Sequence, residues 1–249
     1  MTEKAPRLVR SYGRRRGRKL RAGQERMVAE LLPRVALDPG DCGPIDVATL
    51  FTFRPRALWL EIGFGAGEHL IRQATRHREI GFIGCEPFLN GIVALLTAMQ
   101  ANTLTNIRVW TEDARRLLPR LPAASVDRVF ILYPDPWPKA RHHKRRIIQS
   151  DFLDLLAQVI APGSELVLAT DHADYLAWIL ERLLDRPDFR WTARGPRDWR
   201  SPPEETVATR YAQKARAAGR DCVYLRFVRL PQGAADRSGK GLPSGPGRV

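Results

Sequence analysis

The sequence predicts an α/β fold with an open, doubly wound, mostly parallel sheet of seven strands. Apolar runs of strand length alternate with segments of helical periodicity, which is typical of a parallel sheet covered by helices on both faces. Acidic residues end most of these runs, where parallel strands deliver polar groups to one edge of a sheet. With 249 residues, 44% of them hydrophobic, the chain can bury one sizeable core, so one main domain is expected.

The first half of the chain supplies three of the strands and two of the helices. Residues 57–63 (ALWLEIG) and 81–86 (GFIGCE) are short apolar runs flanked by glycine, and both predict buried strands. The segments 69–78 and 89–104 place apolar residues at helical spacing. A third strand is expected over 106–113 (NIRVWTED). Together these elements give the alternating strand and helix order of a parallel sheet.

The second half of the chain completes the sheet. Residues 125–135 (SVDRVFILYPD) predict a fourth strand, and the helix expected over 150–163 is stopped by its own Pro162 and Gly163. The two last strands are expected to pair antiparallel. The remaining elements are a fifth strand over 165–171, a helix over 174–185, and final strands over 189–195 and 221–230.

Charge and composition divide the chain into an arm, a core and a tail. The chain carries 41 Lys and Arg against 27 Asp and Glu, a net charge of +14, which favours a polyanionic partner such as nucleic acid. We expect a basic N-terminal arm with a lead-in helix over 1–35, the main domain over 36–230, and a disordered tail over 231–249 that is rich in Gly, Pro and Ser. The arm is either a solvated disordered segment or one that orders on nucleic acid.

Cysteine and histidine usage argues against a disulfide framework and against a metal site. Cys42, Cys85 and Cys222 are odd in number and widely spaced, and the five histidines form no pair with ligand spacing. No apolar run approaches the roughly 18 residues of a membrane span. We therefore expect a cytoplasmic protein with no membrane contact, and an organellar transit peptide is the alternative for the Arg-rich N-terminus.

Five carboxylates fall at corresponding strand ends. In doubly wound sheets, ligands bind in the crevice beyond the carboxyl ends of the strands. Any one of these acids alone is best explained as a helix N-cap or a surface acid, but five at one edge predict a ligand site. The five are Glu61, Glu86, Asp113, Asp135 and Asp171.

The turn after the first strand points to a nucleoside without phosphates. Gly63, Gly65 and Gly67 are spaced G-x-G-x-G, which lets a ligand approach the backbone but lacks the spacing of a pyrophosphate-binding turn. Glu86 ends the second strand, where an acid can accept both hydroxyls of a ribose. An adenosine with a cationic tail would explain the additional carboxylate at Glu61. S-adenosylmethionine is such a ligand.

Several motifs resemble those of the bacterial tRNA (guanine-N7-)-methyltransferases. They are E-I-G-F-G-A-G from Glu61, the acid at Glu86, D-A at Asp113, P-D-P-W-P-K over 134–139 and T-D at Thr170. The resemblance covers about residues 10–230, and P-D-P-W-P-K followed by basic residues is its most specific part. It implies a class I methyltransferase (Rossmann-like) fold over 36–230. It also implies methyl transfer from S-adenosylmethionine to N7 of a guanosine in the variable loop of tRNA.

The resemblance also implies roles for individual residues. The chemistry of the transfer, rather than the resemblance, makes Asp135 the expected catalytic group, because positive charge moves from the sulfur toward the purine and a carboxylate near the base stabilises it. The methyl donor would be bound by Glu61, Gly63, Gly65, Gly67, Glu86, Asp113 and Asp135, and the RNA by Lys139, Asp171, Thr209, Arg210 and Tyr211. The expected partner is tRNA, with no obligatory protein partner, and the protein would be a monomer or a homodimer.

One position departs from the family pattern. Thr209-Arg210-Tyr211 is followed by Ala212, where the family has a glutamate expected to bind substrate. Loss of that carboxylate would weaken turnover or move its role to Glu204 or Glu205.

The chemistry of guanine N7 suits a site made of carboxylates and positively charged side chains. N7 carries a lone pair and no proton, so its methylation needs no general base, and positioning should supply most of the rate. The A-form major groove is too narrow for side chains, so the base must be splayed out. Trp137 would then stack on the purine or pack over the sheet edge. The RNA phosphates are expected to meet Lys139, Arg141, Lys144, Arg145 and Arg146.

Other function classes remain open from the sequence. A nucleotide-dependent oxidoreductase is disfavoured by the glycine spacing and by the lack of a Tyr-x-x-x-Lys pair on a helix. A non-catalytic RNA-binding protein with this fold is kept open by Ala212. A methyltransferase acting on another RNA, or on an amino group of adenine, is the remaining alternative.

Overall fold

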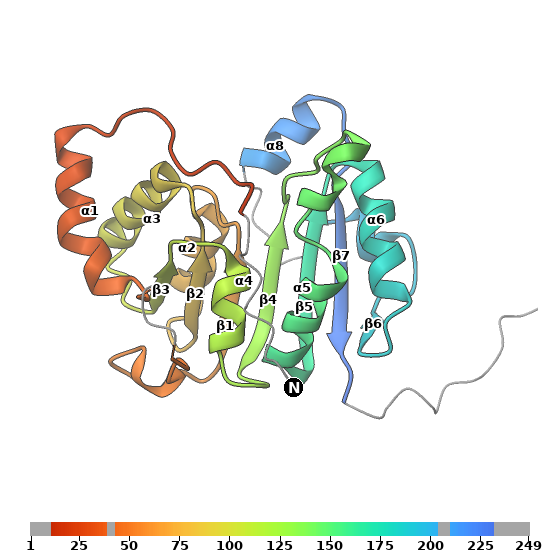
Figure 1. Ribbon diagram of the computed structural model, residues 1–249, viewed down its shortest axis with the longest axis horizontal. Helices are drawn as coiled ribbons and strands as arrows, with labels where there is room; N and C mark the ends of the chain where they lie inside the picture. Colours follow the sequence, from red (N-terminus) through yellow and green to blue (C-terminus); the bar gives the residue numbers. More distant parts are fainter. Residues whose placement is uncertain (1–10, 39–42, 204–209, 232–249) are drawn as a thin grey trace, which may run out of the picture.

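A seven-stranded sheet organises the chain in the order β3-β2-β1-β4-β5-β7-β6, as seen in Figure 1. The structure is a computed structural model, and it describes residues 11–38, 43–203 and 210–231. The strands are β1 Leu58–Ile62, β2 Gly81–Cys85, β3 Ile107–Trp110, β4 Val126–Leu132, β5 Ile160–Thr170, β6 Phe189–Trp191 and β7 Val223–Arg229.

The sequence order of the parallel strands changes direction at the neighbouring strands β1 and β4. β1 pairs in parallel with β2 on one side and with β4 on the other, and β2–β3 and β4–β5 are also parallel. β7 lies antiparallel between β5 and β6. The order of the parallel strands therefore reverses between β1 and β4, which is where such sheets bind ligands. The predicted fold class, with a mostly parallel sheet of seven strands and an antiparallel final pair, is confirmed.

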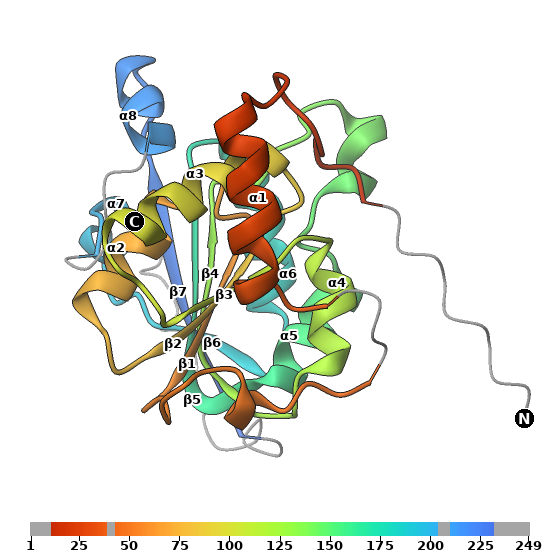
Figure 2. The same cartoon turned by 90° about the vertical axis from the view of Figure 1, so that its left-hand side faces the viewer.

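Helices cover both faces of the sheet. Leu70, Ile92 and Leu95 form the core with α2 and α3 on one face, and Phe152 and Tyr175 belong to the core with α5 and α6 on the other. Figure 2 shows α2 and α3 on one side of the sheet and α4, α5 and α6 on the other. The longer helices are α1 Ala22–Val35, α2 Glu68–Arg76, α3 Leu89–Ala101, α5 Ser150–Val159, α6 Ala173–Leu184 and α8 Arg210–Ala217.

Several short elements were not expected. They are α4 Ala114–Leu117, α7 Arg197–Arg200 and the 3₁₀ turns η1 Val47–Thr49, η2 Leu118–Arg120 and η3 Ala140–Arg145. All are too short to show a helical period in the sequence. The basic segment expected to meet RNA phosphates is partly helical, through η3.

Several element boundaries were predicted wrongly. The elements α3, β3 and β6 end at Ala101, Trp110 and Trp191 rather than at 104, 113 and 195, and β5 begins at Ile160 rather than at 165. α5 ends at Val159 rather than at 163, because Ile160 already pairs with Val126 and the following Pro162 and Gly163 lie within β5. β4 ends at Leu132 rather than at 135, because Tyr133 takes a left-handed φ of 52° and leaves the strand conformation.

The basic arm lies against the domain from Ser11 onward. The Asn90 side chain accepts a hydrogen bond from the Gly17 N–H (2.8 Å) and donates one to the Arg18 carbonyl (2.9 Å). The Leu89 N–H donates to the Arg15 carbonyl at 3.0 Å. These bonds run the arm across the start of α3, so residues 11–20 are ordered on the protein itself. The tail expected to be disordered lies, from residue 232 on, outside the described residues.

None of the helices in the described part of the chain has the length and apolar character that crossing a bilayer requires.

Candidate active site

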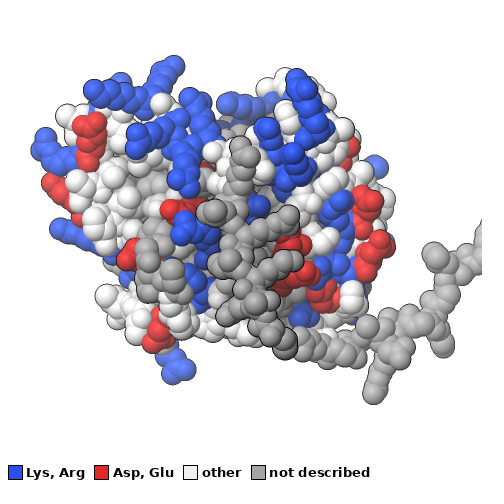
Figure 3. Space-filling model, viewed as in Figure 1, with Lys and Arg blue, Asp and Glu red and all other residues white. Residues whose placement is uncertain are grey.

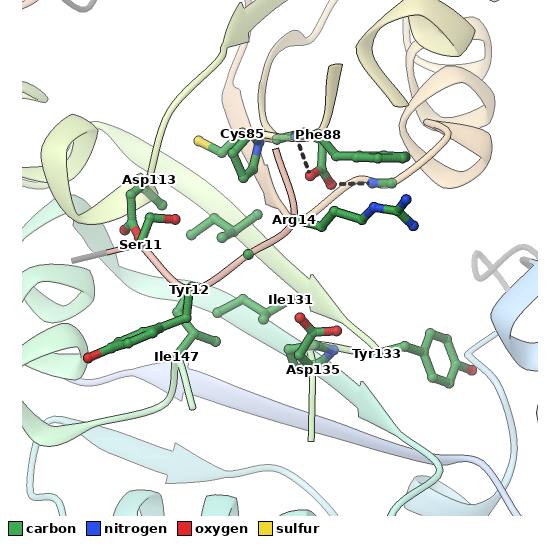
Figure 4. A pocket seen from close by; sticks show the side chains of 18 of the residues that line it. Ser11, Tyr12, Arg14, Cys85, Phe88, Asp113, Ile131, Tyr133, Asp135 and Ile147 are labelled. Carbon is green, nitrogen blue, oxygen red and sulfur yellow. Dashed lines mark hydrogen bonds between the residues drawn. The ribbon is translucent and has the colours of Figure 1, made fainter. Parts of the chain in front are cut away.

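A cavity of about 380 Å³ opens at the carboxyl ends of β1, β2 and β4. Its size falls in the range of small-ligand pockets. Apolar side chains such as Ile62, Ile131 and Ile147 line its floor, and the acids Glu86, Asp113 and Asp135 surround them. Residues Ser11–Arg14 of the arm also line it, and Figure 4 shows this segment passing between Asp113 and Asp135. The arm is thus one wall of the cavity.

The glycine turn after β1 brings backbone to the cavity. Gly63, Gly65 and Gly67 all have positive φ, at 78°, 57° and 79°, which L side chains rarely adopt. A Cβ on Gly63, which lines both cavities, would meet none of the described atoms within 4 Å. Gly67 has a packing role instead, because its Cβ would lie 2.6 Å from Leu95 Cδ1.

Glu86 is fixed by two backbone donors. The Gly65 N–H donates to Glu86 Oε2 at 2.8 Å, and the Phe88 N–H donates to Oε1 at 3.0 Å, the two bonds drawn in Figure 4. Each oxygen keeps a lone pair for another donor, such as a ribose hydroxyl. Burial raises the pKa of Glu86, and the charges of Asp135 and Glu61 raise it further, although the two N–H bonds act the other way.

Asp113 is the N-cap of α4 and the partner of Arg115. Arg115 donates from Nε to Oδ1 (2.9 Å) and from Nη2 to Oδ2 (2.7 Å), and its own N–H caps Oδ1 at 3.0 Å. Burial raises the pKa of Asp113, but these bonds, with a weaker one from Ser11, outweigh burial and hold the pKa below its usual value. Asp113 therefore stays ionised beside the arm.

Glu61 belongs to a buried polar chain that the sequence did not reveal. Its Oε2 lies 2.7 Å from His69 Nδ1, and His69 Nε2 lies 3.2 Å from Gln73 Nε2. All three side chains are buried. Glu61 and His69 line a second cavity of about 430 Å³, which shares Gly63, Gly65 and other lining residues with the first. The spacing of four residues between His69 and Gln73, which places them on one face of a helix, was the sequence signal that could have predicted their contact.

Asp135 stands on a strained loop at the mouth of the first cavity. Tyr133 and Trp137 on either side of it have φ of 52° and 44°, a region that costs non-glycine residues energy. Asp135 is exposed to solvent, yet the surrounding protein raises its pKa by desolvation. Trp137 is half-buried, with its ring edge-on to His142 and the Arg145 guanidinium 4.9 Å from its centre.

The basic segment after this loop does not act as one surface. Lys139, Arg141 and Lys144 are exposed, whereas the Arg145 guanidinium lies over the Tyr12 and Trp137 rings. Arg146 is buried, so the expectation that it binds phosphate is wrong, because its guanidinium is enclosed by protein. Figure 3 shows Lys and Arg side chains gathered along the edge at which the parallel strands end, at the top of the view.

The expected RNA-binding residues take different places. Arg210 pairs with Glu68 at 2.5 Å and lines the second cavity, and Tyr211 is exposed and lines both cavities. Asp171 pairs with Arg220 at 2.8 Å, and neither of these two residues lines either cavity. Lys139 stands exposed at the start of η3. Thr209, Glu204 and Glu205 lie outside the described residues.

Ala212 faces inward rather than into either cavity. It is 1% exposed and packs in a cluster with Ala169, Ala215, Cys222 and Tyr224. The hydroxyls of Tyr133 and Tyr224 lie 3.1 Å apart at the edge of this cluster. Tyr133, which lines both cavities, packs against this cluster.

The residues of the first cavity fit S-adenosylmethionine. Glu86 keeps lone pairs for ribose hydroxyls, the open side of Gly63 admits a close backbone approach, and the isoleucines offer an apolar slot for a purine. Glu61, which lines the adjoining second cavity, would hold the cationic end. No cluster of three or more His, Cys, Asp or Glu side chains able to hold a metal ion occurs among the described residues.

Comparison with curated relatives shows the family of this chain. The family described as "Putative methyltransferase" matches residues 55–225. The tRNA (guanine-N(7)-)-methyltransferase of Rhodospirillum rubrum is 44% identical over 99% of this chain and 98% of its own. That of Nitrobacter hamburgensis is 46% identical over 88% of this chain and 86% of its own. A solved 16S rRNA methyltransferase, KamB, has a TM-score of 0.49 at 18% identity, covering 71% of this chain and 89% of that one. The chain belongs to the tRNA (guanine-N(7)-)-methyltransferase family and depends on S-adenosylmethionine as that family does.

Proposed function

We propose that this protein transfers a methyl group from S-adenosylmethionine to N7 of a guanosine in the variable loop of tRNA. The observation that carries the proposal is the position of Asp135, which lines a nucleoside-sized cavity a few residues before the exposed Lys139, Arg141 and Lys144. Family membership supports the reaction. The combination of a donor cavity and a polycationic rim supports an RNA substrate.

The site needs no base to activate the nucleophile. S-adenosylmethionine supplies, when bound, an electrophilic methyl group on a sulfonium. N7 of a neutral guanosine offers a lone pair and loses no proton, so the protein has only to align the two reactants. The carboxylates and aromatic rings around Asp135 provide such alignment without a nucleophilic side chain.

Asp135 is the proposed catalytic group. Positive charge moves from the sulfur toward the purine during transfer, so a carboxylate nearer the base stabilises the transition state more than the ground state. The loop holds Asp135 at the rim, farther out than Glu86, whose oxygens are tied to the backbone. Glu86, Glu61 and Asp113 then serve donor binding.

The RNA is held by the rim of the cavity. The exposed Lys139, Arg141 and Lys144 would meet phosphates, while the exposed ring of Tyr211 and the half-buried Trp137 would contact the splayed base. Asp171 is paired with Arg220 away from both cavities, so it would contact RNA only after this pair opens.

Methyl transfer to unmodified tRNA tests the proposal. Purified protein is incubated with labelled S-adenosylmethionine and a tRNA transcript, and the product nucleoside is identified and mapped. We expect 7-methylguanosine in the variable loop. Asp135→Ala should abolish transfer while reducing donor affinity only in part, and Asp185→Ala, at the exposed end of α6, should match the wild type. Wild-type turnover by Asp135→Ala would overturn the assignment, and another methylated nucleoside would overturn the substrate.

A further inference from the structure

A buried arginine ties the loop that carries Asp135 to α6. Arg146 is 1% exposed, although it closes a run of basic residues. Its Nε donates a hydrogen bond to the Pro136 carbonyl at 2.9 Å, and its Nη2 pairs with the Asp174 carboxylate. The guanidinium also lies 4.9 Å from the ring centres of both Tyr175 and Trp178. One side chain thus joins the residue after Asp135 to three residues of α6.

The groups around Arg146 compensate for the burial of its charge. A guanidinium loses its hydration on burial, and it stays charged because an ion pair and aromatic faces replace water. Tyr175 and Trp178 are themselves fixed, since Trp178 Nε1 donates to the Ile148 carbonyl at 2.7 Å. Arg146 Nη1 is buried without a hydrogen-bond partner among the described residues. Such a cost is tolerated where it maintains a geometry that function needs.

The loop residues next to Asp135 offer few backbone donors of their own. Pro134 and Pro136 carry no N–H, so they cannot donate backbone hydrogen bonds. Tyr133 and Trp137 occupy left-handed backbone conformations that relax unless the surroundings hold them. At the start of the loop the Tyr133 N–H donates to the Ala169 carbonyl at 2.8 Å, and next to Asp135 the Pro136 carbonyl accepts from Arg146 Nε at 2.9 Å.

We propose that Arg146 is a positioning residue for Asp135, acting through the Pro136 carbonyl, and that it has no part in binding RNA phosphates. The proposal rests on the proposed function, in which Asp135 is the catalytic group. Asp174 shares the role because it is the charged partner of Arg146 on α6. Lys144, two residues earlier and exposed, is the contrasting case of a phosphate contact.

Steady-state kinetics of Arg146→Lys tests the proposal. Lysine keeps the charge but cannot hold the carbonyl, the carboxylate and both rings at once. We expect kcat to fall by about tenfold to a hundredfold, with KM for tRNA and the salt dependence of tRNA binding unchanged, because misplacement of a catalytic group acts on the chemical step. Lys144→Ala should do the opposite, raising KM for tRNA and lowering the salt slope by about 0.7 to 0.9.

A second variant covers the case in which Arg146→Lys does not fold. The Asp174 side chain is 55% exposed, so Asp174→Asn should fold and should lower kcat in the same direction with an unchanged donor Kd. An increase in KM for tRNA at normal kcat, in either variant, would assign Arg146 to RNA binding and overturn the proposal.

The two proposals fail in distinguishable ways. If Asp135→Ala is inactive while Arg146→Lys and Asp174→Asn turn over normally, Asp135 is catalytic and Arg146 does not position it. If Asp135→Ala is fully active, the catalytic assignment itself has failed, whatever Arg146→Lys does.

Discussion

His69 Nδ1 lies 2.7 Å from Glu61 Oε2, and both side chains are buried at the end of β1. With the Gln73 amide nitrogen facing His69 Nε2, that ring nitrogen accepts and Nδ1–H donates to Glu61. Glu61 therefore has one oxygen held by α2 while its side chain lines the second cavity. His69 therefore orients Glu61, one of the residues proposed to bind the methyl donor.

The first prediction follows for donor affinity. His69→Leu leaves the buried Glu61 carboxylate without its hydrogen-bond donor, which costs about 1–3 kcal/mol. We expect the affinity for S-adenosylmethionine, measured by titration calorimetry, to fall about fivefold to a hundredfold, with little change in kcat at saturating S-adenosylmethionine. His69→Asn places an amide N–H near the position of Nδ1 and should restore most of the affinity. Equal affinities for the Leu and Asn variants would show that the bond to Glu61 is irrelevant.

A control on the same helix separates this effect from a general change in α2. His77 follows the last residue of α2, where it is half-buried and its Nδ1 lies 3.8 Å from Glu79. His77→Leu should leave the donor affinity at the wild-type value.

The second prediction concerns the contact between α3 and the glycine turn. A Cβ on Gly91 would lie 2.2 Å from the Gly65 carbonyl oxygen and 3.5 Å from Glu86 Cγ. Gly91→Ala must therefore push α3 away from the turn and should cost about 1–3 kcal/mol of stability. Because Gly65 also holds Glu86, donor affinity should fall as well. Thermal unfolding and donor titration measure the two effects.

Gly23→Ala is the matched control for this substitution. Gly23 lies in α1, and its Cβ would meet none of the described atoms within 4 Å. Alanine is favoured over glycine in a helix, so the melting temperature should rise slightly or stay unchanged. A Gly91 variant that behaves like the Gly23 variant would mean that the turn yields without cost.

Much of the fold and part of the site could be predicted from the sequence. Strands are fixed by local apolar runs, and a carboxylate that ends a parallel strand must come to the crevice, so Glu86, Asp113 and Asp135 were found. What each carboxylate does there depends on long-range partners. Arg115 forms hydrogen bonds with Asp113, and His69 forms one with Glu61. Both partners lie on helices, and the sequence pattern does not show which residue of a helix will meet a given carboxylate.

Arg145 and Arg146 show the limit of sequence reasoning most directly. The two residues are adjacent and chemically identical, yet one lies over two rings at the cavity and the other is enclosed beside α6. Charge alone predicts two phosphate contacts. The burial of Arg146 depends on Asp174, Tyr175 and Trp178, about thirty positions later in the chain, which only the folded structure brings together.

The third prediction is a pH dependence of donor binding. Burial raises the pKa of Glu86, so this acid takes up a proton at a higher pH than an ordinary glutamate as the pH falls. The protonated form loses acceptor capacity for ribose hydroxyls. An ordinary glutamate titrates near pH 4.3. The Kd for S-adenosylmethionine should therefore begin to rise at a higher pH than this as the solution is acidified. Calorimetry from about pH 5 to 8 measures it, and Glu86→Gln should show weak binding without this dependence.

A flat pH profile in the wild type would mean that the Glu86 carboxylate does not bind the donor. The charge of Asp135 contributes to the raised pKa of Glu86, so Asp135→Asn should shift the profile toward lower pH.

The fourth prediction concerns the arm, which Asn90 holds through two hydrogen bonds to Gly17 and Arg18. Asn90→Ala removes both bonds, and because Ser11–Arg14 form a wall of the cavity, donor affinity should fall about threefold to tenfold. Proteolysis within residues 11–20 should accelerate. Asn102→Ala, at the far end of α3 where Asn102 bonds the Ala98 carbonyl, should change neither. Faster proteolysis with unchanged donor affinity would show that the arm covers the cavity without contributing to donor binding, and its role would then belong to the RNA.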